Sequence, residues 1–350
     1  MRAFILLTLI LAACTPASDA TIGFIGPLTG DASQWGIPPS EGAALAAREH
    51  GVHIVYEDSK CDPKLGVAAA QKLITQDKVT AIVGAICSSV TLAITPIAEA
   101  HNVVLISPAS TNPKITDTAA FRVVPSDAHR GEVFAHYLYD KNVRTVGIIH
   151  INNDGGLGNR ESFTTTFVAL GGTVAIVETY DQEATDMRTQ LLKLNDVSPE
   201  AIVAVSHPAD SILLLQQARE LGITIPFYFQ TEAPDDPSVL TAVGDAADIE
   251  YILAAPATGA TVDRFVRVFE EYYEKEPALY AAEGYDAVTL LAASIASCGD
   301  AHSCIKEYIH GVREHKGASG TITIDENGDV QKPMAIKRIT DGEKKIIKII

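Results

Sequence analysis

Short apolar runs rich in β-branched residues alternate with amphipathic stretches along most of the chain. Eight runs have the composition of strands that are buried on both faces of a parallel sheet. These predicted strands are residues 21–25, 53–56, 81–83, 103–106, 145–149, 173–177, 201–205 and 225–229. Stretches with helical spacing, such as 39–50, 64–76 and 210–221, separate them. The alternation predicts an α/β fold made of βαβ units, with helices on both faces of each sheet.

The length of the chain and two interruptions of the pattern predict two lobes. A chain of 350 residues exceeds what a single hydrophobic core usually supports. Residues 121–125 follow the first set of βα units and residues 256–261 follow the second, so each is a predicted crossing between lobes. We therefore expect two doubly wound parallel-sheet lobes joined by a multi-strand hinge. Hinged lobes of this kind close on ligands at the carboxyl ends of their strands.

Each predicted lobe is assembled from two stretches of the chain. The expected N-terminal lobe is 21–123 plus 257–330, and the expected C-terminal lobe is 124–256 plus 331–350. Helices are predicted at 262–275 and 280–297, where apolar residues keep helical spacing. Segments 321–324 and 334–339 flank the turn Glu326-Asn327-Gly328 and are expected to form a terminal antiparallel pair.

Composition and charge favour a compact protein that handles small molecules. Hydrophobic residues make up 47% of the chain and charged residues 20%, which argues against extensive disorder. The formal net charge of −17 repels phosphate backbones. Nucleic acid is therefore not an expected partner.

The N-terminus has the pattern of an export signal. Met1-Arg2 precedes an apolar run, residues 3–13, that is too short to span a bilayer. The run ends in Leu11-Ala12-Ala13-Cys14, which is typical of a lipoprotein cleavage site with Cys14 as the acylated residue. We expect residues 1–20 to be a lipoprotein signal and tether, and the protein to be exported and membrane-anchored in the periplasm or at the cell surface. The alternative is an ordinary signal peptide with an incidental cysteine.

Export changes how the other four cysteines are interpreted, because oxidising compartments favour disulfides. Four cysteines allow three pairings. Cys298 and Cys304 are separated by a short loop and are expected to pair with each other, which leaves Cys61 and Cys87. A catalytic or metal-binding role for Cys87, or for Cys298 and Cys304 with His302, is the alternative.

Signatures of common enzyme classes do not occur in the sequence. No G-x-G-x-x-G follows the first predicted strand, and no P-loop, H-E-x-x-H or G-x-S-x-G is present. The run Gly155-Gly156-Leu157-Gly158 could cradle a phosphate, or could let a helix start close to the sheet. Histidines such as His101, His129 and His150 are scattered, without metal-ligand spacing. We expect no enzymatic activity, no cofactor and no metal.

Three polar stretches each join a predicted strand end to a helix start. They are Cys87-Ser88-Ser89, Pro108-Ala109-Ser110-Thr111 and Gln230-Thr231-Glu232. Ser88 and Thr111 offer hydroxyls beside predicted helix N-termini, where a carboxylate is favoured. Glu232 offers an acceptor for an ammonium group from the other lobe. Taken singly, the hydroxyls fit ordinary N-caps and Glu232 a solvated loop residue; together they describe a site for a zwitterion.

Several longer stretches occur in an order that is hard to obtain by chance. They are Ile25-Gly26-Pro27-Leu28-Thr29-Gly30, Gln34-Trp35-Gly36, Glu57-Asp58-Ser59-Lys60-Cys61-Asp62-Pro63, Cys87-Ser88-Ser89, Ser107-Pro108-Ala109-Ser110-Thr111, His207-Pro208 and Gln217-Ala218-Arg219-Glu220-Leu221-Gly222. In these stretches the sequence resembles the leucine/isoleucine/valine-binding proteins of branched-chain amino acid ABC transporters, which have a type I periplasmic-binding-protein fold. The resemblance covers about residues 21–339.

The resemblance implies roles for individual residues. It implies a Cys61–Cys87 disulfide, a carboxylate site at Ser88, Ala109 and Thr111, with Ser110 in the same stretch, and an ammonium site at Glu232. Aromatic walls of the side-chain pocket are implied at Trp35 and Tyr280. Gly155 and Ser206 stand where the family commonly has tyrosines, so the second-lobe face of the pocket is expected to be larger or wetter.

The expected function is that of an extracytoplasmic, monomeric substrate-binding lipoprotein that captures a branched-chain or related amino acid for an ABC transporter permease. Three alternatives remain open. One is a ligand-sensing module of the same fold. Another is an enzyme of the doubly wound class, and the third is a protein that binds a small amide or another metabolite.

Overall fold

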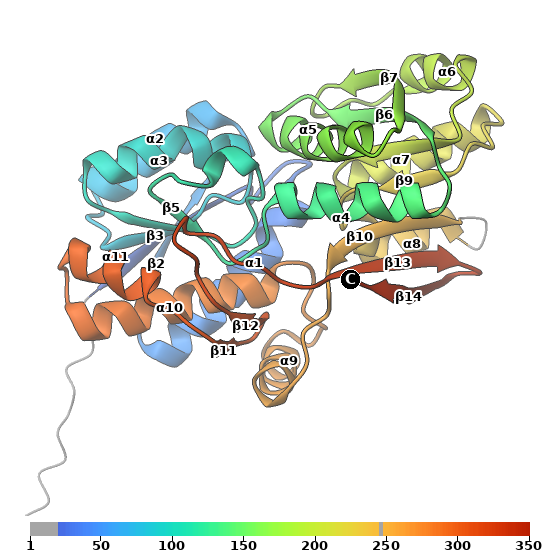
Figure 1. Ribbon diagram of the computed structural model, residues 1–350. Helices are drawn as coiled ribbons and strands as arrows, with labels where there is room; N and C mark the ends of the chain where they lie inside the picture. Colours follow the sequence, from blue (N-terminus) through green and yellow to red (C-terminus); the bar gives the residue numbers. More distant parts are fainter. Residues whose placement is uncertain (1–19, 245–247) are drawn as a thin grey trace, which may run out of the picture.

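The computed structural model describes residues 20–244 and 248–350, so the predicted lipidation site Cys14 lies outside the described residues. Two sheets form the centres of two lobes that lie side by side (Figure 1). The first sheet is parallel, with strand order β2-β1-β3-β4-β5. Its strands are β1 (Thr21–Gly26), β2 (His53–Asp58), β3 (Ala81–Gly84), β4 (Val104–Ser107) and β5 (Ala120–Arg122).

Helices cover both faces of the first sheet. One face carries α1 (Ser33–His50), α10 (Ala281–Cys298) and α11 (His302–His310), and the other carries α2 (Pro63–Thr75) and α3 (Ser88–Ala100) (Figure 1). Asp62 caps α2 by accepting hydrogen bonds from the N–H groups of Lys64 and Leu65, and Pro63 suits the first helical position. The alternation of strands and helices in the sequence is therefore reproduced as two apolar cores, one on each face.

The second sheet has seven strands in the order β14-β13-β10-β9-β8-β6-β7. They are β6 (Thr145–Ile151), β7 (Thr173–Tyr180), β8 (Ala201–Val205), β9 (Phe227–Phe229), β10 (Ile249–Ala254), β13 (Met334–Thr340) and β14 (Glu343–Ile349). One face packs against α4 (Asp127–Asp140) and α5 (Asp154–Ala169). The other packs against α6 (Arg188–Asp196), α7 (Pro208–Glu220) and α8 (Pro237–Val243).

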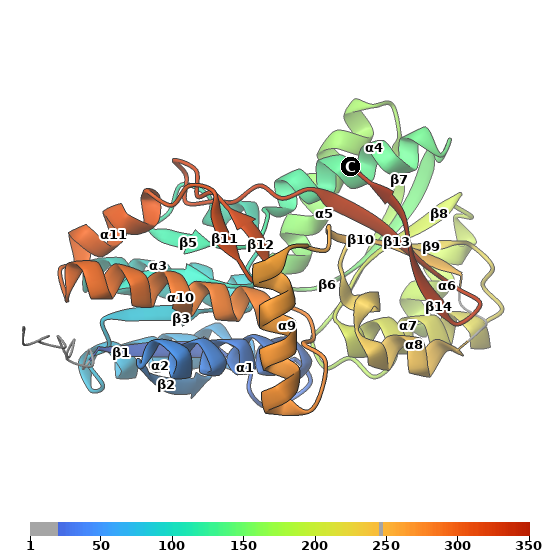
Figure 2. The ribbon, with the colours of Figure 1, turned by 90° about the horizontal axis from the view of Figure 1, so that it is seen from below.

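The chain passes between the two sheets three times: after β5, after β10 and before β13 (Figure 2). Helix α9 (Ala260–Tyr273) follows the second passage, beside the junction of the lobes. A two-stranded sheet of β11 (His315–Gly317) and β12 (Gly320–Ile322) precedes the third. The predicted fold class, two α/β lobes with parallel sheets, is confirmed. Within the described residues, no helix is long and apolar enough to cross a bilayer.

The predicted terminal antiparallel pair is wrong. Residues 320–322 pair with β11, whereas β13 lies between β10 and β14 and is antiparallel to both. The reason is burial: Met334, Ala335 and Ile336 are fully buried, so β13 completes the second sheet. The edge strand next to β13 is β14, which the sequence pattern did not predict.

Helix α1 also differs from the prediction, since it begins at Ser33 and contains Pro38 and Pro39. Because proline is common at the first helical position, the two prolines suggested a later start. The added first turn matters for function because it carries Trp35.

Candidate ligand-binding site

A cavity lies between the lobes, with about 60 Å³ of space in which the centre of a water molecule fits. It is lined by residues that follow the carboxyl ends of β3 and β4 in the first lobe and of β6, β8 and β9 in the second. The lining residues are Trp35, Ile86, Cys87, Ser88, Ser89, Ala109, Thr111, Arg130, Ile151, Asn153, Gly155, Gly156, Asn159, Val205, Ser206, His207, Thr231 and Glu232. This is where open α/β sheets bind ligands.

Ser88 is the first residue of α3 and lies at the cavity wall. Its Oγ accepts a hydrogen bond from the backbone N–H of Asn112 at 3.2 Å, so its hydroxyl proton remains available for donation. The first N–H groups of a helix have no carbonyl partner within the helix, and the helix dipole is positive at this end. Ser88 and the start of α3 together suit an anionic group.

The hydroxyl of Thr111 differs from that of Ser88 because its proton is already donated within the protein. Its Oγ1 donates to Asp127 Oδ2 at 2.8 Å, so the hydroxyl presents lone pairs to the cavity. A single 3₁₀ turn (Pro113–Ile115) follows, so the prediction of a helix N-terminus beside Thr111 is wrong. The hydroxyl of Thr111 therefore suits a cationic group, and the predicted donation from this hydroxyl to a carboxylate is not supported by the geometry.

Two residues of the predicted site do not line the cavity. Ser110 is fully buried, and its hydroxyl donates to the carbonyl oxygen of Ala85 at 2.9 Å. Tyr280 packs against Trp35 with ring centroids 5.5 Å apart. Ser110 therefore does not face this cavity, because its hydroxyl is engaged inside the lobe, and Tyr280 lies behind Trp35, which does line the cavity.

Among the described residues that line the cavity, Arg130 and Glu232 are the two with a full charge. Glu232 follows β9, Arg130 lies on α4, and Arg130 Nη1 is 2.5 Å from Glu232 Oε2. Arg130 Nε also lies 3.9 Å from Asp127 Oδ1. Burial raises the pKa of Asp127 to about 6, although Arg130 and Thr111 oppose the shift.

The second-lobe wall is open at Gly155. A Cβ there would have Asn153 Oδ1 at 3.3 Å and Ser88 Oγ at 3.9 Å as its neighbours. A Cβ at Gly156 would lie 2.0 Å from the carbonyl oxygen of Ile151, so Gly156 lets α5 start close to the sheet. Ser206 also lines this wall, but its hydroxyl is engaged by Ser211 Oγ at 2.7 Å.

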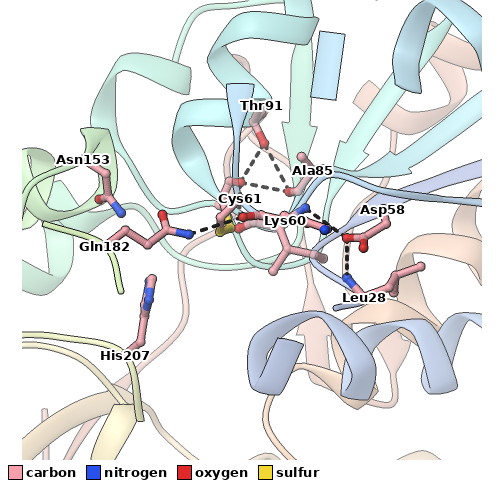
Figure 3. The surroundings of a disulfide bond; sticks show 12 residues. Leu28, Asp58, Lys60, Cys61, Ala85, Thr91, Asn153, Gln182 and His207 are labelled. Carbon is pink, nitrogen blue, oxygen red and sulfur yellow. Dashed lines mark hydrogen bonds between the residues drawn. A yellow bond between two sulfur atoms is a disulfide. The ribbon is translucent and has the colours of Figure 1, made fainter. Parts of the chain in front are cut away.

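The two lobes touch around the cavity. The rings of Trp35 and His207 lie 5.2 Å apart across it. Gln182 Nε2 donates to the carbonyl oxygen of Lys60 at 3.3 Å, a contact between the lobes that Figure 3 shows. The side chain of Asn112 donates to the carbonyl oxygen of Asp154 on the other lobe. The structure is therefore that of a closed pair of lobes.

Cysteine pairs support the first lobe. The Cα atoms of Cys61 and Cys87 are 5.5 Å apart, and those of Cys298 and Cys304 are 5.7 Å apart, within the range that disulfides span. Cys87 lines the cavity, and Figure 3 shows Cys61 next to Lys60. Cys61 lies in the loop before α2, and Cys87 is the N-cap residue of α3, directly before Ser88.

Sequence reasoning missed four polar residues of the cavity wall: Arg130, Asn153, Asn159 and His207. Asn153 follows β6 and caps α5 by accepting from the N–H of Gly156, so its place after a strand was a usable signal. His207 precedes Pro208 after β8 and was equally accessible. Arg130 and Asn159 lie inside helices, where no strand end marks them; only the structure brings them to the cavity.

Comparisons with known proteins place this geometry in a family. A leucine-, isoleucine-, valine-, threonine- and alanine-binding protein of Pseudomonas aeruginosa is 26% identical over 339 residues, covering 90% of this chain and 88% of that protein. The crystal structure of a leucine-binding protein of Thermotoga maritima has a TM-score of 0.88 and 31% identity, covering 95% of this chain and 98% of that one.

Two further solved structures share the fold. A branched-chain amino acid transporter binding protein of Streptococcus pneumoniae, in complex with isoleucine, has a TM-score of 0.83 at 24% identity and covers 95% of this chain and 99% of its own. A solute-binding protein of R. palustris, in complex with benzoate, has a TM-score of 0.86 at 19% identity, with 95% and 96% covered. The family profile of the periplasmic binding proteins matches residues 19–344. The chain belongs to the periplasmic binding protein family.

Proposed function

We propose that this protein binds a free amino acid between its two lobes and delivers it to the permease of an ABC transporter. The observation that carries the proposal is that the hydroxyl of Ser88 can donate to a ligand, whereas the hydroxyl of Thr111 can only accept from one. One hydroxyl has its proton available and stands at a helix N-terminus, and the other has its proton committed to Asp127. An anionic group and a cationic group are thus accommodated side by side, as in the head group of an amino acid.

The carboxylate is held by the first lobe. The hydroxyl of Ser88 and the first N–H groups of α3 donate to it, and Ala109 and Trp35 line the wall next to it. Because these donors belong to one lobe, the ligand can be held there before the lobes close.

The ammonium is held by Thr111 Oγ1 and Glu232, which come from different lobes. Closure therefore adds a contact that the open form does not make, and a ligand shifts a conformational equilibrium only through such differential contacts. The Trp35–His207 contact then covers the cavity. This division of labour couples recognition of the head group to closure.

The ligand side chain faces the second-lobe wall formed by Gly155, Ser206 and His207. The wall leaves space at Gly155, and the pKa of His207 is lowered by burial, so its imidazole is neutral at neutral pH. Uncharged side chains, including ones larger than that of valine, fit such a surface. The Pseudomonas aeruginosa relative, a leucine-, isoleucine-, valine-, threonine- and alanine-binding protein, supports this class.

Export, anchoring and assembly are part of the same proposal. The N-terminal pattern supports removal of a signal and lipid attachment at Cys14, and export supports the disulfides Cys61–Cys87 and Cys298–Cys304. The protein acts as a monomer without a cofactor. The moving units are the lobes 21–123 plus 257–330 and 124–256 plus 331–350.

A thermal-shift screen tests the proposed function. The purified protein is heated with each of the twenty amino acids, and with small amides, dicarboxylates and nucleotides. At about 100 times its Kd, a ligand adds roughly 2.7 kcal/mol to the free energy of unfolding, which raises Tm measurably. A rise with particular amino acids supports the proposal; a rise with amides or nucleotides and with no amino acid contradicts it.

A further inference from the structure

Three buried charges meet behind the proposed ammonium site. The exposed fractions are 3% for Arg130, 3% for Glu232 and 0% for Asp127. Buried charges are costly unless they are paired. Two carboxylates share one guanidinium here, so the cluster has a net charge of −1 when both carboxyl groups are ionised. Arg122, another cation near Asp127, is held by both oxygens of Asp329 and does not balance it.

We propose that Arg130 and Asp127 are positioning residues of the ammonium site, a proposal that rests on the proposed function. Arg130 holds Glu232 through Oε2, at 2.5 Å. Both carboxylate oxygens of Glu232 are buried without a hydrogen-bond partner among the described residues, so the contact with Arg130 is an ion pair, and Oε1 is not engaged by Arg130 although Glu232 lines the cavity. Arg130 thus fixes the carboxylate in the orientation in which its second oxygen can accept from the ligand.

Asp127 connects the two acceptors of the ammonium site. Its Oδ2 accepts from Thr111 Oγ1 at 2.8 Å and from Asn159 Nδ2 at 2.7 Å, and its Oδ1 faces Arg130 Nε. It therefore turns the lone pairs of Thr111 toward the cavity and helps to hold Arg130 against Glu232. One carboxylate orients the acceptor from the first lobe and, through Arg130, the acceptor from the second.

The ammonium of the ligand completes this cluster. Two carboxylates, one guanidinium and one ammonium sum to zero, whereas a carboxylic acid without an amino group leaves the buried net charge uncompensated. Arg130 and Asp127 therefore favour amino acids over the corresponding des-amino acids without touching the ligand's side chain. Replacing Arg130 leaves two buried carboxylates facing each other, so one of them takes up a proton and Glu232 is no longer held.

A double-mutant cycle tests this role. The affinity of the amino acid with the largest thermal shift is measured by calorimetry for wild type, Arg130→Met, Glu232→Gln and the double variant. We expect Arg130→Met to weaken binding at least tenfold in the wild-type background, because Glu232 then loses its buried ion-pair partner. In the Glu232→Gln background we expect less than a twofold effect, because Arg130 acts through Glu232.

Control variants show whether Arg130 acts on the ammonium site or only on the folding of the protein. Arg160→Met removes an arginine on α5 in the same lobe that pairs with Glu161, and is expected to leave affinity unchanged. If Arg130→Met does not fold, Arg130→Lys carries the same cycle, with an intermediate loss expected because lysine keeps the charge and lacks the planar fork.

An Arg130 effect of equal size in both Glu232 backgrounds, no effect, or tighter binding would overturn the inference while the proposed function stands. Failure of the wild-type protein to bind any of the twenty amino acids would overturn the proposed function, and the inference with it.

Discussion

The two walls of the cavity differ in how they contact a ligand. The first-lobe wall is uncharged: Ser88, Ala109 and Trp35 offer a hydroxyl, a methyl group and an indole around the N-terminus of α3. The second-lobe wall has both full charges, Arg130 and Glu232. In the proposed function, the first lobe binds the carboxylate and offers the Thr111 hydroxyl to the ammonium, whereas the second lobe supplies the charge that pairs with the ammonium and borders the side-chain space.

The largest loss of binding free energy is expected when Glu232, the acidic residue of the second-lobe wall, is replaced. Glu232→Ala removes the acceptor and leaves the ligand ammonium beside Arg130, so we expect binding of an amino acid to weaken by about 2–5 kcal/mol. Calorimetry measures the loss. Glu161→Ala, at a half-exposed glutamate of the same lobe, is the matched control and should bind as wild type. Unchanged affinity for Glu232→Ala would mean that the second-lobe wall does not recognise the ammonium.

The next effect is expected at the first-lobe hydroxyl. Ser88→Ala removes one donor to an anionic group, and we expect a loss of about 1.5–3 kcal/mol, the usual range for hydrogen bonds to charges. The loss should be similar for an amino acid and for its des-amino acid, because both have the carboxylate. Calorimetric titration of both ligands measures this. A loss confined to the amino acid would assign Ser88 to the ammonium and reverse the roles of the two walls.

Acidification is expected to weaken binding of the ligand ammonium, because Asp127 orients Thr111 directly and Glu232 through Arg130. The pKa of Asp127 is raised to about 6, first by burial and further by Glu232, while Arg130, Thr111 and Arg122 oppose the shift. The ammonium of a ligand lowers this pKa in the complex, so binding releases a proton near pH 6. The affinity of an amino acid should therefore fall as the pH decreases through about 6, by up to roughly tenfold per pH unit.

The ligand-free protein should show the opposite trend from this group. Because the folded pKa of Asp127 lies above its model value of 3.8, the folded state binds this proton more tightly than the unfolded state. Its contribution to the free energy of unfolding therefore rises as the pH falls from about 6 toward 4. Urea denaturation of wild type and of Asp127→Asn at several pH values isolates this contribution to the free energy of unfolding.

The same variant tests the prediction for affinity. That prediction fails if ligand binding by Asp127→Asn depends on pH as it does in wild type.

The smallest effect is expected at two adjacent glycines. Gly155→Ala places a methyl group 3.9 Å from Ser88 Oγ and 3.3 Å from Asn153 Oδ1, so with a small shift of the Asn153 side chain it should fold and weaken the largest accepted amino acid severalfold more than alanine. Gly156→Ala pushes Cβ to 2.0 Å from the carbonyl oxygen of Ile151, so it should lower Tm instead. Thermal melting and a ligand series measure both. The reverse assignment would mean that Gly156, and not Gly155, borders the side-chain space.

Parts of the molecule that depend on local pattern could be predicted from the sequence. Buried parallel strands such as β1, β6 and β8 are continuous apolar runs, so the fold class could be predicted from the sequence. Ser88 and Glu232 follow strand ends, so half of the head-group site could be predicted as well. Short or edge strands such as β5 and β14 lack that pattern, because burial comes from neighbours distant in the sequence.

The charge cluster could not be predicted for a similar reason. Asp127 and Arg130 occupy the first turn of α4, where acidic residues commonly serve as helix-terminal charges. Their link to Glu232 is tertiary and spans about a hundred residues of chain. Likewise, the orientation of the Thr111 hydroxyl depends on Asp127, so its preference for a cation required the structure.

Calorimetric titration of the wild-type protein with its best-binding amino acid and with the matching des-amino acid is the most direct test of the central claim. The two walls together require both charged groups of the head, so the account predicts that the des-amino acid binds at least about 100-fold more weakly, near the lower end of the cost of an unpaired buried charge. Equal affinity for the two ligands would contradict it.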